Sequence, residues 1–295
     1  MKKNPVIIGL IVIGVIMVVF IGAIVLLTLL FRSETPSFTA GARVGVVEIT
    51  GVISDSKDII RELNAFAQDG GVKAIVLRID SPGGGVGASQ EIYRQVVKAR
   101  EVKPVVASFG GVAASGGYYV ACGAEKIVAN PGTITGSIGV VMQFANLEEL
   151  FKKIGYKGYV LKSGTHKDIG SPLREMTPEE KELLQQVIDN VHQQFIRAVA
   201  EGRKLPLEKV AAIADGRIFA GEQAKDVGLV DELGNLEDTI EIAARLGGIK
   251  GRPAVVYSHK KKSSLLDFFT ESIAHRIKEE VRDTTQPGLD YIWQQ

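Results

Sequence analysis

The sequence predicts an α/β protein with parallel strands and crossover helices, preceded by one N-terminal transmembrane helix. Three observations support this prediction. A long uncharged segment lies near the start of the chain, short β-branched runs then alternate with helical patterns, and the pattern beyond residue 145 is mainly helical. With 295 residues, the chain is long enough to bury a sizeable core.

Residues 6–31 are predicted to form a transmembrane signal anchor. These 26 residues carry no charged side chain, and as a helix they would extend roughly 39 Å, more than a hydrocarbon core of about 30 Å. The segment is too long for a cleavable signal and lacks a small-residue cleavage site. Because Lys2 and Lys3 precede it, the positive-inside rule places residues 1–5 in the cytoplasm and the rest of the protein outside.

The chain after the anchor divides into a linker, one folded domain and a tail. Residues 32–42 are small, polar and turn-prone, which is typical of a tether. Residues 43–262 form the expected domain, and residues 263–295 form the tail. The apolar spacing predicts an amphipathic helix over 265–283 in that tail, and such a stripe more often packs against the protein than against a membrane or partner.

The elements of the domain follow from the spacing of apolar residues. Short β-branched runs predict strands at 43–49, 73–79, 104–109 and 126–129. Helical spacing predicts helices at 57–68, 87–101, from about 115, 207–214, 221–227 and 235–246. A capping box that begins at Thr177 predicts the start of a long helix that runs to about residue 202.

Composition excludes several classes of protein. Hydrophobic residues make up 45% of the chain, too many for a disordered protein, and a single cysteine cannot build a disulfide framework. The formal net charge of +1 gives no electrostatic footprint for nucleic acid. The four histidines are scattered and form no zinc-binding motif, so the sequence predicts no metal site. Cys122 is interpreted as a small buried hydrophobe rather than a reactive thiol.

A glycine run at 83–85 lies where a predicted strand gives way to a helix. No Lys-Ser or Lys-Thr pair follows it, so it is not a nucleotide-binding P-loop. Glycines let an extended peptide approach the backbone closely, and exposed N–H groups favour negative charge such as a developing oxyanion.

Ser115 is a candidate nucleophile. It is flanked by small residues at the expected start of a helix, where its own N–H and the next one are free. A helix-capping serine has the same surroundings, so the residues alone leave the two interpretations equal. No G-x-S-x-G motif or His/Asp pairing indicates a hydrolase triad.

A neutral lysine can activate a serine instead. Lysine titrates near 10.4 in water, so a base that works near neutral pH needs burial or a nearby positive charge. Lys167 lies in a segment rich in small and turn-forming residues, 162–172, which follows a predicted strand. Spacing alone does not distinguish Lys167 from an ordinary solvated lysine.

Four motifs in order resemble the signal peptide peptidase A family, whose members are membrane-anchored bacterial Ser/Lys proteases. These motifs are DSPGG at 80–84, GGVAASGGYY at 110–119, GTITGSIGV at 132–140 and KSGTHKDIGSP at 162–172. The resemblance covers about residues 43–250 and implies a fold related to the Clp protease subunit and the crotonases. The chain has no internal repeat, which resembles the short form of the family.

The resemblance implies a role for each candidate residue. Ser115 is the expected nucleophile and Lys167 the expected general base. The N–H groups of Gly84 and Gly116 are the expected oxyanion hole, and the Ser137 hydroxyl is expected to orient the lysine amine. The resemblance implies no cofactor and no metal.

The expected function is that of a serine endopeptidase that degrades remnant signal peptides and other small apolar peptides. The resemblance implies a homo-oligomeric ring. It leaves open whether Ser115 and Lys167 of one site come from the same protomer or from neighbouring protomers, an arrangement that the short form of the family allows. The expected location is the bacterial cell membrane, with one span and an extracytoplasmic catalytic domain. The alternative is a membrane-tethered crotonase-like ring that binds or scaffolds without turnover, although a scaffold would not need Ser115, Ser137 and Lys167 together. Acyl-CoA chemistry is disfavoured because an external domain would not meet CoA.

Overall fold

The computed structural model describes residues 41–258 and 290–292, together with the isolated positions 14, 17, 18 and 22. Nearly all of the anchor expected at 6–31, most of the linker and the amphipathic helix expected at 265–283 therefore lie outside the described residues. Among the residues that are described, no helix is long and apolar enough to cross a membrane.

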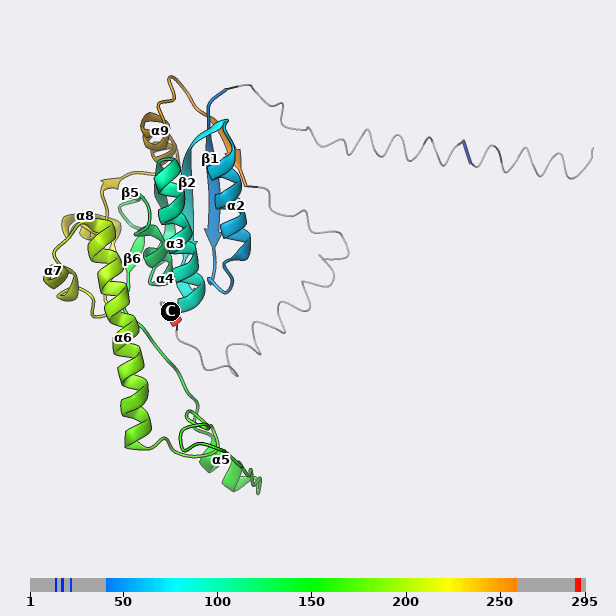
Figure 1. The fold of residues 1–295 in the computed structure, drawn as a ribbon, viewed down its shortest axis with the longest axis vertical. Coiled ribbons are helices and arrows are strands. Elements are labelled where there is room, and N and C mark those ends of the chain that lie inside the picture. Colours follow the sequence, from blue (N-terminus) through cyan, green and yellow to red (C-terminus); the bar gives the residue numbers. More distant parts are fainter. Residues whose placement is uncertain (1–13, 15–16, 19–21, 23–40, 259–289, 293–295) are drawn as a thin grey trace, which may run out of the picture. The chain divides into compact units, whose positions relative to one another are not determined.

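The described fold is a sheet covered by helices on both faces (Figure 1). Within the described residues the main sheet has eight strands, with β7-β6-β4-β2-β1-β9 in order. β5 pairs with β4 beside this row, and β8 pairs with β5. The central pairs β1–β2 and β2–β4 are parallel, whereas β6 and β7 are antiparallel. The prediction of an α/β fold with parallel strands and crossover helices is confirmed, although the sheet is mixed. The main-sheet strands are β1 (Arg43–Thr50), β2 (Val72–Ser81), β4 (Val105–Ala114), β5 (Lys126–Ala129), β6 (Ile134–Gly136), β7 (Ile218–Ala220), β8 (Glu232–Leu233) and β9 (Ala254–Tyr257).

Alternate residues of the central strands build two apolar layers. In β2, Ile75 and Leu77 belong to the larger core on the side of α2, α3 and α4, while Ala74 and Val76 belong to a smaller core against α9. This alternation follows from the two-residue period of a strand, and a sheet buried on both faces explains the nearly continuous apolar runs in the sequence. The helices are α2 (Lys57–Gln68), α3 (Val86–Val102), α4 (Gly116–Ala121), α5 (Glu148–Lys153), α6 (Pro178–Arg203), α7 (Leu207–Ala211), α8 (Gly221–Asp226) and α9 (Leu236–Leu246).

Helix α6, the longest in the described part of the chain, begins where the sequence predicts. Thr177 accepts a hydrogen bond from the Glu180 N–H at 3.2 Å, and the Glu180 carboxylate accepts one from the Thr177 N–H at 2.9 Å, which completes the capping box. Apart from Glu180, its buried residues all lie near its C-terminal end, from Phe195 onward. The N-terminal half of α6 therefore projects from the core.

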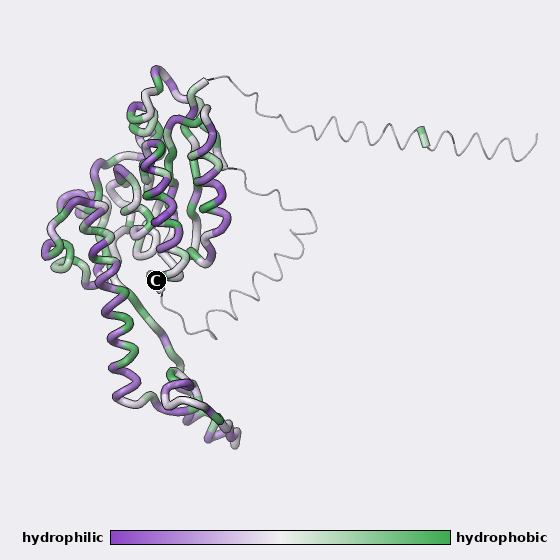
Figure 2. The backbone as a smooth tube through the Cα atoms, viewed as in Figure 1, coloured by the Kyte–Doolittle hydropathy of each residue, from purple (hydrophilic) through white to green (hydrophobic). Residues whose placement is uncertain are grey.

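Residues 141–177 connect β6 to the projecting end of α6, and we call this segment together with the N-terminal half of α6 the arm. The arm contains the short helix α5 (Figure 1). The strand expected just before Lys162 is not formed, because residues 156–161 are exposed and irregular and have no neighbouring strand. Figure 2 shows that apolar residues nevertheless continue along the arm.

Two short strands form a separate pair beside the sheet. β3 (Gly83–Gly85) follows β2, and β10 (Asp290–Ile292) pairs with it in antiparallel fashion, with Tyr291 opposite Gly84. The pattern of the sequence predicts neither strand, since glycine is depleted in strands and β10 is only three residues long.

Candidate active site

The candidate residues that lie outside the arm are found at the carboxyl ends of parallel strands. Ser115 directly follows β4 and Ser137 directly follows β6, while the glycine strand β3 comes directly after β2. In α/β sheets this edge is where ligands bind.

Ser115 has an unusual backbone conformation, with φ 50° and ψ −115°. Only 1% of its surface is exposed, its N–H donates to the Gly136 carbonyl at 2.8 Å, and its carbonyl accepts from the Tyr119 N–H at 2.8 Å. A positive φ is costly for a residue with a side chain and persists only where surrounding contacts enforce it. These contacts fix the Ser115 backbone, and its side chain makes no capping hydrogen bond to the helix.

Small residues allow α4 to begin so close to β2 and β3. A side chain on Gly117 would place its Cβ 3.0 Å from the Ser81 carbonyl oxygen. The N–H of Gly116, in the first turn of α4, has no hydrogen-bond acceptor among the described residues. Such a free N–H beside a serine is able to stabilise negative charge.

Ser137 repeats the geometry of Ser115 on the neighbouring strand. It has φ 50°, is 7% exposed, and its N–H donates to the Arg217 carbonyl at 2.8 Å. The strands β4 and β6 are parallel, and their register pairs Ala114 with Gly136. The two serines therefore follow directly paired residues and lie side by side.

The backbone of Ile53 pairs with one edge of the glycine strand β3. Ile53 donates to the Gly83 carbonyl at 2.8 Å and accepts from the Gly85 N–H at 2.9 Å. Because backbone groups alternate in direction along a strand, the N–H and carbonyl of Gly84 face the opposite edge. Gly84 has φ 158°, and a Cβ there would lie 2.2 Å from the Ile53 carbonyl oxygen, so the close approach requires glycine.

The opposite edge of β3 is the one that β10 occupies. β10 also contacts α3 and α4, so this tail strand lies next to the helix that follows Ser115. An extended backbone thus runs antiparallel along Gly84, which is the way a peptide adds to the edge of a sheet.

Two side chains that the sequence analysis did not identify shape this edge. The Ser81 hydroxyl donates to the Gly51 carbonyl at 2.6 Å and accepts from the Gly83 N–H at 3.1 Å, which fixes the turn into β3. The Asp80 carboxylate accepts from the Val112 N–H at 3.0 Å, where the register between β2 and β4 shifts. Ser81 could have been found from the sequence, because a serine before a proline is a turn signal. Asp80 could not, because its hydrogen-bond partner is 32 residues away in the sequence.

Lys167 lies in the arm, and among the described residues it makes no contact with Ser115 of the same chain. Its side chain is exposed, and its amine has no hydrogen-bond or ion-pair partner among the described residues. Phe195 packs on Tyr119 of α4 with ring centroids 4.9 Å apart, whereas the lysine segment contacts the other end of α6. The fifteen helical rises from Glu180 to Phe195 amount to about 22 Å, so the lysine segment lies far along α6 from the turn that packs on α4.

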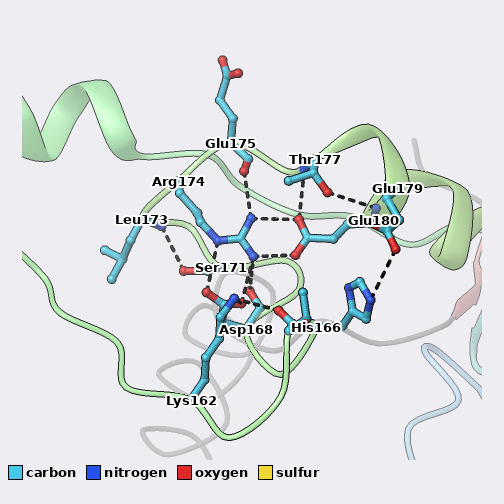
Figure 3. Close-up of polar contacts among 11 residues, drawn as sticks. Lys162, His166, Asp168, Ser171, Leu173, Arg174, Glu175, Thr177, Glu179 and Glu180 are labelled. Carbon is cyan, nitrogen blue, oxygen red and sulfur yellow. Dashed lines mark hydrogen bonds and ion pairs between the residues drawn. The ribbon is translucent and has the colours of Figure 1, made fainter.

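The lysine segment is tied to the start of α6 by a network of charged groups (Figure 3). The Arg174 guanidinium donates to the Asp168 carboxylate at 2.9 and 3.1 Å and to the Glu180 carboxylate at 2.5 and 2.8 Å. The Lys162 ammonium donates to Asp168 at 2.5 Å. These bonds fix Asp168, the residue that follows Lys167 in the chain.

Comparisons with known proteins agree with this architecture. The profile described as peptidase family S49 matches residues 98–250, and the profile described as Clp protease matches residues 43–146. Together these matches span β1 to α9, including both serines, the glycine strand and the arm.

Several named proteins are similar over about two thirds of the chain or more. A putative protease of Synechocystis is 48% identical over 209 residues, covering 70% of this chain and 75% of that protein. A putative protease of Methanocaldococcus jannaschii is 37% identical over 280 residues, covering 90% and 89%. A putative signal peptide peptidase of Enterococcus faecium is 35% identical over 209 residues, covering 66% and 61%.

Proposed function

The chain belongs to peptidase family S49, a family of serine proteases, and we propose that it cleaves peptides with Ser115 as nucleophile and Lys167 as general base. The observation that carries this assignment is the conformation of Ser115, which is strained, fixed by its backbone and placed beside the open N–H of Gly116. A serine that served only as a helix cap would have its side chain bonded to the helix.

The reaction proceeds in two steps. The Ser115 Oγ attacks the scissile carbonyl while the Lys167 amine takes its proton, and the N–H groups of Gly84 and Gly116 stabilise the oxyanion. The amine then gives that proton to the leaving amino group, which leaves an ester on Ser115. Water attacks the ester, Lys167 takes a proton from the water and returns it to Ser115, and the second peptide product departs. The Ser137 hydroxyl orients the amine.

The substrate binds as an extended strand on the edge of β3 that β10 occupies, and takes the place of β10 there. The position of β10 supports this mode, because a backbone already lies antiparallel to Gly84 there. Main-chain hydrogen bonds to a glycine strand give affinity without requiring particular side chains. The substrates are small apolar peptides, including remnant signal peptides released into the membrane.

Each catalytic unit combines Ser115 of one protomer with Lys167 of a neighbour in a homo-oligomeric ring. Support comes from the arm, because the lysine segment is bonded to the start of α6, about 22 Å of helix away from Phe195, which packs on α4. The arm also exposes large apolar side chains that a second copy would cover, including Ile154 (66% exposed), Tyr159 (87%) and Leu161 (100%). Burial of the amine in that interface favours the neutral form that a base requires.

The protein is held in the cell membrane by residues 6–31, with residues 1–5 in the cytoplasm and the protease domain outside. The support is the uncharged run itself and the two lysines that precede it.

The assignment is tested with full-length protein in detergent and a fluorogenic apolar peptide. Ser115→Ala and Lys167→Ala are each expected to reduce kcat/KM by at least 10³-fold, the order seen when a nucleophile or its base is removed. Lys157→Ala, another exposed arm lysine, is the matched control and retains activity. Activity of either site variant near that of the unaltered protein contradicts the proposal.

A further inference from the structure

The residues around Lys167 form a balanced set of charges. Lys162 and Arg174 carry two positive charges, Asp168 and Glu180 carry two negative charges, and all four are linked by hydrogen bonds (Figure 3). Asp168 and Glu180 are well enclosed, with side chains 12% and 4% exposed, while Arg174 is 31% exposed.

The two carboxylates are strongly held as anions. Hydrogen bonds from Arg174 and Lys162 keep the pKa of Asp168 well below its ordinary range, and those from Arg174 and the Thr177 backbone lower the pKa of Glu180 to about 2. Each carboxylate is therefore charged at any pH at which a protease would work, and its negative charge acts on neighbouring titratable groups.

Lys167 directly precedes Asp168 in the chain. The Lys167 N–H donates to the Gly164 carbonyl at 3.2 Å and the Ser171 N–H donates to the Asp168 carbonyl at 3.0 Å, so both residues belong to one tight series of turns. A nearby anion stabilises a protonated amine. In the proposed mechanism the amine must be neutral, so an uncompensated Asp168 opposes the reaction.

We propose that Arg174 is a positioning residue that fixes the Lys167 segment on α6 and offsets the Asp168 carboxylate, so that this anion does not hold the neighbouring amine in its protonated form. This inference rests on the proposed role of Lys167. Arg174 suits the task because one guanidinium donates to Asp168 through Nε and Nη2 and to Glu180 through Nη1 and Nη2.

Other charged groups surround the same segment. The His166 Nε2 lies 3.7 Å from the Glu179 carboxylate, and the Glu175 N–H donates to the Glu148 carboxylate at 3.1 Å. On α5, Lys152 lies 2.9 Å from both Glu148 and Glu149. None of these groups is bonded to Asp168 among the described residues, so its compensation comes from Arg174 and Lys162.

The inference is tested by the pH–activity profile of the full-length protein with the fluorogenic peptide. Arg174→Gln leaves the cluster with one excess negative charge. It is expected to shift the acid limb of the profile, the rise of kcat/KM on its acidic side, to higher pH by about half a pH unit or more. The double variant Arg174→Gln with Asp168→Asn removes that charge again and is expected to return the limb to its original position. The upward shift in Arg174→Gln is expected to shrink in 1 M salt.

Two further variants separate charge from structure. Arg174→Lys keeps the positive charge without the guanidinium fork, so its acid limb is expected to match that of the unaltered protein even where its rate is lower. Lys152→Gln removes a cation from the same arm that is not bonded to Asp168, and it is expected to leave the limb in place.

The results that would overturn this inference about Arg174 differ from those that would overturn the proposed mechanism. An unchanged acid limb in Arg174→Gln, or an equal shift in the double variant, overturns the inference and leaves Arg174 with a structural role only. Activity of Lys167→Ala close to that of the unaltered protein overturns the proposed function instead.

Discussion

Ser115 and Ser137 occupy equivalent positions on two parallel strands, each one residue beyond the paired residues Ala114 and Gly136 and each with φ 50°. The Gly136 carbonyl also accepts the Ser115 N–H. Two positive-φ serines side by side are costly. The arrangement is explained if one hydroxyl reacts and the other orients the base.

Replacing Ser137 with alanine tests the second half of that explanation. The Ser137→Ala variant is expected to lower kcat by about tenfold or more and to change KM by less than about twofold, because positioning of the base matters in the transition state. Steady-state kinetics on the apolar peptide provide the measurement. Ser258→Ala, at the end of β9, is the control, and a fall limited to KM argues against an orienting role.

The glycine strand predicts a sharp contrast between two glycines. Gly84→Ala is expected to disrupt β3 and abolish peptide cleavage, since its Cβ would lie 2.2 Å from a backbone oxygen. Gly87→Ala, at an exposed position in α3 with nothing within 4 Å, is expected to preserve activity and to stabilise the protein by about 1 kcal/mol. Thermal unfolding and activity assays check both. Full activity in Gly84→Ala would show that peptides do not bind along this strand.

The tail strand predicts competition with substrate. Deleting residues 290–295 removes β10 and is expected to lower KM for short peptides severalfold, with little change in kcat, because the edge of β3 becomes free. A synthetic peptide with the sequence of residues 287–295 is expected to inhibit the shortened protein competitively. An unchanged KM and no inhibition would show that β10 and the substrate use different edges.

The single cysteine is expected to be inert in the folded protein. Burial raises the pKa of Cys122 to about 12, so the thiolate that reacts with disulfide reagents is scarce near neutral pH. Modification by a thiol-reactive dye is expected to be at least 100-fold slower in native than in unfolded protein. The raised pKa also predicts that stability falls as the pH rises above about 9, where the unfolded thiol ionises and the buried one does not. Rapid labelling of native protein contradicts this description.

Much of the fold could be predicted because the signals are local. The helix at 57–68 and the strand at 126–129 have the bounds that apolar spacing predicts, and the capping box at Thr177 forms as expected. The short strands β3, β6 and β10 could not be predicted, since their pairing depends on partners distant in the sequence.

Some residues of the candidate site could likewise be predicted from local sequence, and others could not. The sequence marks Ser115, Ser137 and Gly84 as residues in small or turn-forming surroundings, and the structure gathers them at one edge of the sheet. The exposed position of Lys167 on an arm could not be predicted from spacing, because the arm is defined by where α6 leaves the core. The bonds of Arg174 to Asp168 and Glu180 join residues six apart across a loop, which no helical or strand period reveals.

The central claim is that one catalytic unit takes Ser115 from one protomer and Lys167 from its neighbour, and co-expression of the two inactive full-length variants tests it most directly. If Ser115→Ala and Lys167→Ala protomers mix at random in a ring, one site in four receives both functional residues. The mixed protein is then expected to recover about a quarter of the activity of the unaltered protein. Mixed oligomers that contain both variants and remain inactive would contradict the claim.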